Sequence, residues 1–163
     1  EQAAALRELT RTHAYLDASR VGIWGLSAGG TNTLNAMFRY PDQYHVGIAV
    51  AAKPRADLYN ASFQEIFQHT PKDNPDGYRD GDALNFAEGL KGDLLIIHGT
   101  GEENTHLQII EHLVNRLIEL GKPFDYMTYP NRGHALSEGP GTRKHMFKLI
   151  ARYLTEHLPP GPR

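Results

Sequence analysis

The sequence has 163 residues, 40% of them hydrophobic and 22% charged, with a formal net charge of −2 at pH 7. These values are typical of one globular domain large enough to bury a core, and the near-neutral charge argues against a nucleic-acid or anionic-membrane partner. Because the sequence has no cysteine and no apolar run long enough for a membrane span, it predicts neither disulfides, nor cysteine chemistry, nor a transmembrane helix.

The first part of the sequence predicts an amphipathic helix and then a strand. Leu6, Leu9 and Leu16 recur among alanine and charged residues over residues 1–16, as is typical of a helix. This start lacks the basic and apolar stretches of a signal peptide, so we expect the chain to begin inside a helix of a longer protein. Residues 21–26 form a nearly continuous apolar run, which predicts a strand buried on both faces.

A tight turn, a helix and a second strand follow. The turn covers residues 25–30, the helix covers residues 31–40 and stops at Pro41, and the second buried strand covers residues 45–52. Residues 52–92 are rich in proline, glycine, aspartate and asparagine and show no clean period, so we expect a loop-rich insertion. An irregular segment of this length in a compact domain is more often functional than idle.

The rest of the sequence alternates strands and helices. Four aliphatic residues in succession predict a strand over residues 93–98, and apolar residues at three-to-four spacing predict a helix over residues 107–120 that ends at Gly121. Residues 124–129 predict a fourth strand and residues 142–158 a last helix. This alternation is typical of an α/β fold with a mostly parallel sheet and flanking helices.

The turn after the first strand carries a candidate nucleophile, Ser27. It lies in Gly-Leu-Ser-Ala-Gly, the G-x-S-x-G pattern of the nucleophile elbow in α/β-hydrolases. We expect glycine at positions 25 and 29 because side chains there would collide at so sharp a turn, and we expect the backbone amide of Ala28 to face the developing oxyanion. The alternative is an ordinary glycine-rich turn.

A serine hydroxyl needs a base, and nine histidines compete for that role. His134 directly follows the fourth strand, at the carboxyl end of the sheet, where α/β proteins keep their chemistry. The alternative is a surface-loop histidine, but the order serine, acid, histidine is that of the α/β-hydrolases. Six other histidines lack this placement, and we expect them to be solvent-exposed or at the edge of the core: His13, His45, His69, His112, His145 and His157.

The acid should follow the third strand, where Glu102 and Glu103 lie. One of them is expected to orient the imidazole, and the other to be an acidic residue in the first turn of the next helix. His98 and His106 flank the two glutamates, but the spacing matches no zinc-peptidase motif and we predict no metal site.

Three segments together resemble the prolyl oligopeptidase family, in its dipeptidyl peptidase IV branch. Residues 20–30, Arg-Val-Gly-Ile-Trp-Gly-Leu-Ser-Ala-Gly-Gly, are similar to its nucleophile segment. Residues 98–106, His-Gly-Thr-Gly-Glu-Glu-Asn-Thr-His, resemble its His-Gly-Thr-x-Asp-Asp-Asn-Val-His stretch, and residues 129–134 resemble its histidine loop. The likeness extends over essentially the whole chain in one consistent order.

The resemblance implies roles for individual residues. The first acid of the pair matches the family's triad acid, which selects Glu102, although the branch has aspartate there. The aromatic pattern Tyr-x-x-x-Tyr-x-Glu-x-Tyr is matched in part, so Tyr59 and Phe63 are predicted to line the pocket for the substrate proline, while we expect Phe67 to pack in the core. Asn104 matches an asparagine that binds a substrate carbonyl.

The function that the resemblance implies is peptide hydrolysis through an acyl-enzyme, with removal of N-terminal dipeptides after proline or alanine and without a cofactor. Ala28 and Ala56 stand where members of the branch have bulkier residues, which implies that the preference has drifted from proline. An esterase or acylaminoacyl peptidase of the same fold is the first alternative. A catalytically silent fragment that offers a binding or dimerisation surface is the second.

The resemblance also implies what surrounds this chain. The family places a β-propeller and the first half of the hydrolase domain ahead of it, including a tyrosine that is the second oxyanion donor. Residues 1–158 are therefore expected to be the C-terminal half of an α/β-hydrolase domain, poorly active alone, with residues 159–163 as a flexible tail. A peptide is the expected substrate, a homodimer is one assembly open to the chain, and a periplasmic or secreted location is slightly favoured over the cytoplasm.

Overall fold

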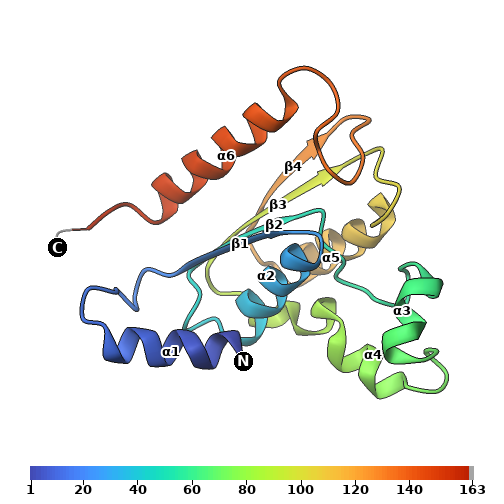
Figure 1. Ribbon diagram of the computed structural model, residues 1–163, viewed down its shortest axis with the longest axis horizontal. Coiled ribbons are helices and arrows are strands. Elements are labelled where there is room, and N and C mark those ends of the chain that lie inside the picture. Colours follow the sequence, from blue (N-terminus) through green and yellow to red (C-terminus); the bar gives the residue numbers. More distant parts are fainter. Residues whose placement is uncertain (162–163) are drawn as a thin grey trace.

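Four parallel strands form the centre of the protein (Figure 1). In this computed structural model, which describes residues 1–161, the strands lie in the order β1-β2-β3-β4 along the sheet. Their bounds are Gly22–Leu26, Val46–Val50, Asp93–Gly99 and Asp125–Tyr129. The helices are α1 Gln2–Thr12, α2 Ala28–Arg39, α3 Ala61–Gln68, α4 Pro75–Gly81, the 3-10 helix η1 Ala83–Gly89, α5 Leu107–Glu119 and α6 Thr142–His157. The α/β fold with a parallel sheet and flanking helices is confirmed.

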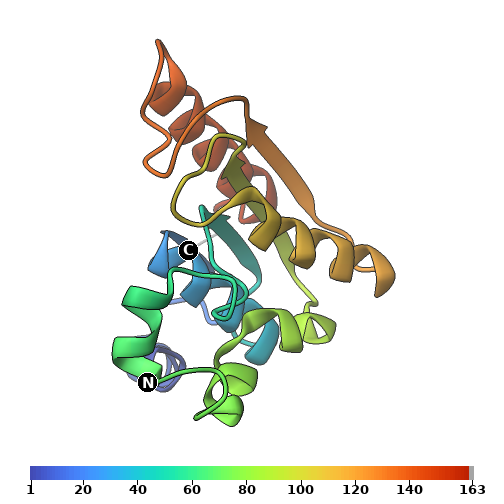
Figure 2. The same ribbon diagram turned by 90° about the vertical axis from the view of Figure 1, so that its right-hand side faces the viewer.

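The sheet separates two hydrophobic clusters, one on each face. Successive side chains of a strand point to opposite faces, so Leu94 and Ile96 of β3 pack with α2, α5 and η1, while Leu95 and Ile97 pack with α6. Figures 1 and 2 show α6 alone along one face and the remaining long helices on the other. Burial on both faces explains why β2 and β3 are continuous apolar runs in the sequence.

Strand β1 departs from its expected burial. It is one of the two edge strands of the sheet, and its residues alternate between exposed and half-buried. Trp24 is 49% exposed and makes an edge-to-face contact with Phe147 of α6, with ring centroids 6.2 Å apart. The prediction of burial on both faces is therefore wrong for β1, because an apolar run indicates a strand but not which elements cover it.

The insertion between β2 and β3 is helical rather than loop-rich. It contains α3, α4 and η1, none longer than eight residues. Helices this short show no sequence period, and α4 begins with residues that are also typical of turns: Pro75 lies in its first turn and the Asn74 side chain accepts a hydrogen bond from the Gly77 amide. The prediction of a loop-rich segment is wrong for that reason.

The observed bounds of the first two helices differ by a few residues from the predicted ones. Helix α1 ends at Thr12, four residues before the predicted end, and α2 begins at Ala28, directly after the candidate nucleophile. The Arg20 side chain donates a hydrogen bond to the Pro159 carbonyl at 2.8 Å, and residues 162–163 of the predicted tail lie outside the described residues. In the described part of the chain, every helix is too short or too polar to cross a membrane.

Candidate active site

Ser27 lies at the turn between β1 and α2 in a conformation that few residues other than glycine adopt. Its φ is 60° and its ψ is −118°, a region that costs free energy and occurs where the surrounding structure enforces it. The Ser27 amide donates to the Val50 carbonyl at 2.9 Å, and the Ser27 carbonyl accepts from the Thr31 amide at 3.0 Å. The strained turn is thus held from β2 on one side and from α2 on the other.

The glycines around Ser27 have different reasons for being glycine. A Cβ at Gly25 would lie 2.4 Å from the Gly29 carbonyl carbon, so position 25 does require glycine. A Cβ at Gly29 would meet nothing within 4 Å, whereas one at Gly30 would lie 2.6 Å from the Val50 carbonyl oxygen. The expected collision at position 29 is therefore wrong: α2 approaches the sheet closely through Gly30, one residue later.

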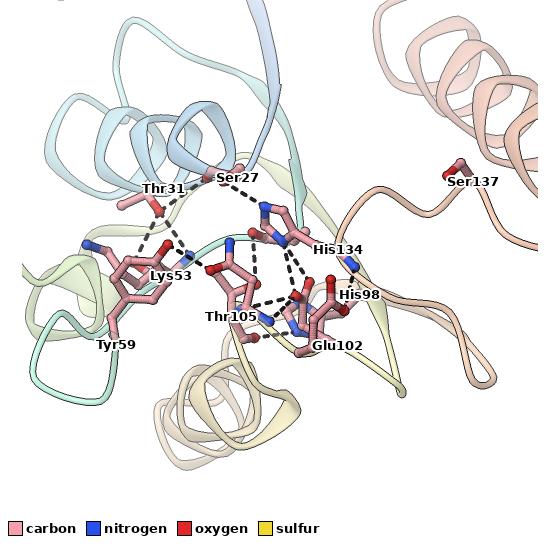
Figure 3. A network of polar contacts seen from close by, with 12 residues as sticks. Ser27, Thr31, Lys53, Tyr59, His98, Glu102, Thr105, His134 and Ser137 are labelled. Atoms are coloured by element: carbon pink, nitrogen blue, oxygen red, sulfur yellow. Dashed lines mark hydrogen bonds and ion pairs between the residues drawn. The ribbon is translucent and has the colours of Figure 1, made fainter. Parts of the chain in front are cut away.

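His134 joins Ser27 to Glu102 (Figure 3). Its Nε2 lies 2.9 Å from Ser27 Oγ, and its Nδ1 lies 2.9 and 3.0 Å from the two carboxylate oxygens of Glu102. A carboxylate only accepts, so Nδ1 carries the proton and donates it, which leaves Nε2 as the nitrogen that faces the serine hydroxyl. The structure therefore brings the predicted nucleophile, base and acid together in one hydrogen-bonded series.

The Glu102 carboxylate is buried, yet it is well supplied with donors. Its Oε1 accepts from the backbone amides of Asn104 at 2.9 Å and Thr105 at 3.0 Å, in addition to His134. Burial by itself would raise the pKa of Glu102, but the hydrogen bonds from His134 and the two amides outweigh it and hold that pKa below its ordinary value. The group is thus an ionised acceptor at neutral pH.

The second glutamate also reaches His134, but at its backbone. The Glu103 carboxylate accepts from the His134 amide at 3.2 Å. Helix α5 begins only at Leu107 and has no acid in its first turn. The expectation that the other glutamate lies in the first turn of the next helix is wrong, because three more residues of the loop of residues 100–106 separate Glu103 from Leu107.

His98 lies near the end of β3 and binds the loop that carries Glu102 from within the core. It is completely buried, and its Nε2 lies 2.9 Å from the Thr105 carbonyl oxygen. Burial lowers its pKa despite the nearby Glu102 charge, so the ring is neutral and Nε2 carries the proton that Thr105 accepts. Its Nδ1 has no partner among the described residues. Sequence reasoning considered His98 only as a metal ligand, and among residues 1–161 no three histidine or acidic side chains are grouped to hold a metal ion.

The predicted substrate-binding residues also lie together. The Tyr59 hydroxyl donates to Asn104 Oδ1 at 2.9 Å, and the rings of Tyr59 and Phe63 meet edge to face with centroids 5.9 Å apart. The Asn104 amide group has no acceptor among the described residues and is free to donate. The ring centroids of Phe67 and Phe63 lie 5.0 Å apart, but Phe67 is 69% exposed. Its predicted place in the core is therefore wrong.

The amide of Ala28 is placed to serve as a donor. Ala28 is the first residue of α2, and the first amides of a helix have no acceptor within it. The positive end of the helix dipole lies at the same point. A negative charge developing beside Ser27 would therefore be stabilised here.

Comparisons with known proteins show what the whole chain is similar to. The sequence model of the prolyl oligopeptidase family matches residues 1–160. Dipeptidyl peptidase 4 of Felis catus is 29% identical over 159 residues, which are 96% of this chain and 20% of that protein. Dipeptidyl peptidase 8 of Mus musculus is 31% identical over 161 residues, which are 97% of this chain and 18% of that protein.

Solved structures give the same result. A crystal structure of Porphyromonas gingivalis dipeptidyl peptidase 4 superposes with a TM-score of 0.92 at 36% identity, over 96% of this chain and 22% of that one. A putative dipeptidyl aminopeptidase IV from Bacteroides ovatus gives a TM-score of 0.91 at 30% identity over the same shares. The chain thus spans about a fifth of the length of these relatives. It belongs to the prolyl oligopeptidase family of serine peptidases.

Proposed function

We propose that this chain carries the catalytic residues of a serine peptidase that cleaves peptides through an acyl-enzyme. One observation carries the proposal: Ser27, His134 and Glu102 form an unbroken hydrogen-bonded series at the carboxyl ends of the strands. This is the edge of a parallel sheet at which α/β proteins bind their ligands. The order of the three residues in the chain is that of the α/β-hydrolases.

The geometry suits general-base catalysis. As Ser27 Oγ attacks the scissile carbonyl, His134 Nε2 accepts its proton, and Glu102 stabilises the imidazolium that forms. The imidazolium then gives the proton to the leaving amine, which departs and leaves an ester on Ser27. A water molecule, activated by the same imidazole, hydrolyses the ester and restores the hydroxyl. The Ala28 amide stabilises the oxyanion in both halves of the reaction.

The substrate proposal rests on the relatives. We propose that the full protein removes N-terminal dipeptides after proline or alanine, with Tyr59 and Phe63 against the side chain of the second residue and the Asn104 amide on a substrate carbonyl. The free amide group of Asn104 and the accessible face of Phe63 support these roles. The second oxyanion donor and the grip on the substrate amino terminus would come from the propeller and the first half of the hydrolase domain.

A fluorophosphonate probe tests the central claim, because it labels a serine only when a base activates it. We expect labelling of the full-length gene product and complete loss of labelling in Ser27→Ala, together with a fall in kcat by a factor of roughly 10³ to 10⁶. Ser137→Ala is the matched control, since Ser137 is exposed and lies on the loop that follows His134 (Figure 3). Labelling that survives Ser27→Ala would refute the assignment.

The same preparation separates the alternatives. Cleavage of a Gly-Pro anilide in preference to a short acyl ester supports the dipeptidyl peptidase. The reverse preference, or release of acylated amino acids, would identify an esterase or acylaminoacyl peptidase on the same fold. A folded protein that the probe does not label would be a silent binding or dimerisation surface.

A further inference from the structure

Lys53 lies next to Tyr59, in the part of the site where the substrate is proposed to bind. It comes three residues after β2 ends. Its amide donates to Thr31 Oγ1 at 2.9 Å, and Thr31 Oγ1 donates back to the Lys53 carbonyl at 3.1 Å. Thr31 in turn lies four residues after Ser27 on α2, where its amide binds the Ser27 carbonyl. The backbone of Lys53 is therefore fixed relative to the nucleophile.

The Lys53 side chain runs to the aromatic residues. Its ammonium lies 4.7 Å from the centroid of the Tyr59 ring and donates to Gln64 Oε1 of α3. Tyr59 binds Asn104 through its hydroxyl, so the cation, the aromatic ring and the free amide of Asn104 are neighbours. Figure 3 shows Lys53 and Tyr59 on the side of Ser27 opposite His134.

Among residues 1–161, this cation has no acidic partner. Lys53 is half-buried, and burial lowers its pKa. In residues 1–161 no carboxylate lies within 4.0 Å of its ammonium. The acid whose charge acts on it, Asp82, is occupied with the Ala56 amide. Lysine is seldom buried without a counter-ion, because loss of water penalises the charge. An ammonium has three donors, and only one is used here.

We propose that Lys53 binds an acidic side chain of the substrate, namely that of the aspartate or glutamate whose own carbonyl Ser27 attacks. The inference rests on the proposed function and deepens it: the site accepts acidic residues at the position proposed for proline or alanine. The carboxylate would supply the counter-ion that the fold lacks. The Tyr59 ring and Gln64 would keep the ammonium in place while the substrate is absent.

The test compares two substrates that differ only in charge, the anilides of Gly-Glu and Gly-Gln, with the full-length gene product. We expect kcat/KM to be higher for Gly-Glu, and the ratio of the two values to fall by about tenfold or more in Lys53→Met, in line with hydrogen bonds to charged groups. Lys53→Arg should restore much of the ratio. Lys122→Met is the matched control. Lys122 is also half-buried, and its ammonium donates to the Leu90 carbonyl near the amino end of β3, whereas the proposed site lies at the carboxyl ends of the strands.

The outcomes distinguish a failure of the role proposed for Lys53 from a failure of the proposed function. A ratio that is one or less in the wild type, or that Lys53→Met leaves unchanged, would overturn the role of Lys53 even while Ser27 is labelled and a Gly-Pro or Gly-Ala anilide is cleaved. Failure of fluorophosphonate labelling and of all four cleavages would overturn the proposed function itself. Because the readout is a ratio within one preparation, a lower yield of folded variant does not imitate the expected effect.

Discussion

The loop of residues 100–106 carries Glu102 and helix α3 carries Phe63, and these two segments are held in opposite ways. In the loop, Glu102 and Thr105 are buried and tied to backbone groups, with His98 bonded beneath them. In α3, the side chains of Phe63, Ile66 and Phe67 are 52%, 75% and 69% exposed. Glu102, which is proposed to orient the base, is thus fixed by burial and backbone hydrogen bonds, whereas Phe63, which is proposed to contact substrate, stands on an accessible helix.

This difference has a physical basis. A misplaced acid would lose the imidazole, and the buried carboxylate would then be left without its main partner, which is costly. An aromatic side chain that recognises apolar surface has no such geometric demand, so it can remain exposed until substrate covers it. Substitutions should therefore have large effects in the loop and small ones in α3.

The largest effect should come from separating the two glutamates. Glu102→Gln should lower kcat by roughly 10³ to 10⁴, because the amide no longer stabilises the imidazolium or enforces the tautomer. Glu103→Gln should cost less than about tenfold, since the amide oxygen can still accept from the His134 backbone. Steady-state kinetics on one dipeptide anilide would measure both, and equal or reversed losses would contradict the roles proposed here.

The next largest effect should be on the stability of variants at the two glycines of the turn, Gly25 and Gly29. Gly25→Ala should destabilise the fold by about 1–3 kcal/mol or more, because its Cβ would overlap the backbone of residue 29. Gly29→Ala should raise the free energy of unfolding by about 0.4–1 kcal/mol, because the site is open, lies in a helix and restricts the unfolded chain. Urea unfolding of both variants measures the contrast, and a destabilised Gly29→Ala would disprove it.

The support beneath the loop can be removed without touching the reacting atoms. His98→Leu leaves the Thr105 carbonyl unpaired in the core, so it should lower the free energy of unfolding by about 1–3 kcal/mol and slow fluorophosphonate labelling. His98→Gln keeps a donor at the place of Nε2 and should recover part of the labelling rate. If His98 only fills space, the leucine variant will label as fast as the wild type.

The smallest effect is expected on α3. Phe67→Ser should change the free energy of unfolding by no more than about 0.5 kcal/mol, because the ring is mostly exposed. Leu113→Ala, a fully buried control in α5, should lose about 2–5 kcal/mol in the same urea titration. A large loss in Phe67→Ser would mean that α3 depends on its aromatic contacts and is not merely an accessible helix.

The sequence by itself determined the strands and the chemistry-bearing positions. Continuous apolar runs are typical of strands in a parallel sheet, and the glycine-rich turn placed Ser27 between a strand and a helix. Chain order pointed to His134 among nine histidines. These features depend on local pattern, which a single sequence records.

Tertiary structure decided everything that depends on neighbours distant in sequence. The residue pattern left Glu102 and Glu103 open and only the resemblance favoured the first, whereas in the structure they divide between the ring and the amide of His134. The exposure of β1, the open space at Gly29 and the bond from His98 to Thr105 were likewise invisible. The sequence did not single out Lys53. Its position over the Tyr59 ring, without a neighbouring carboxylate among the described residues, arises only when β2, α2 and α3 come together.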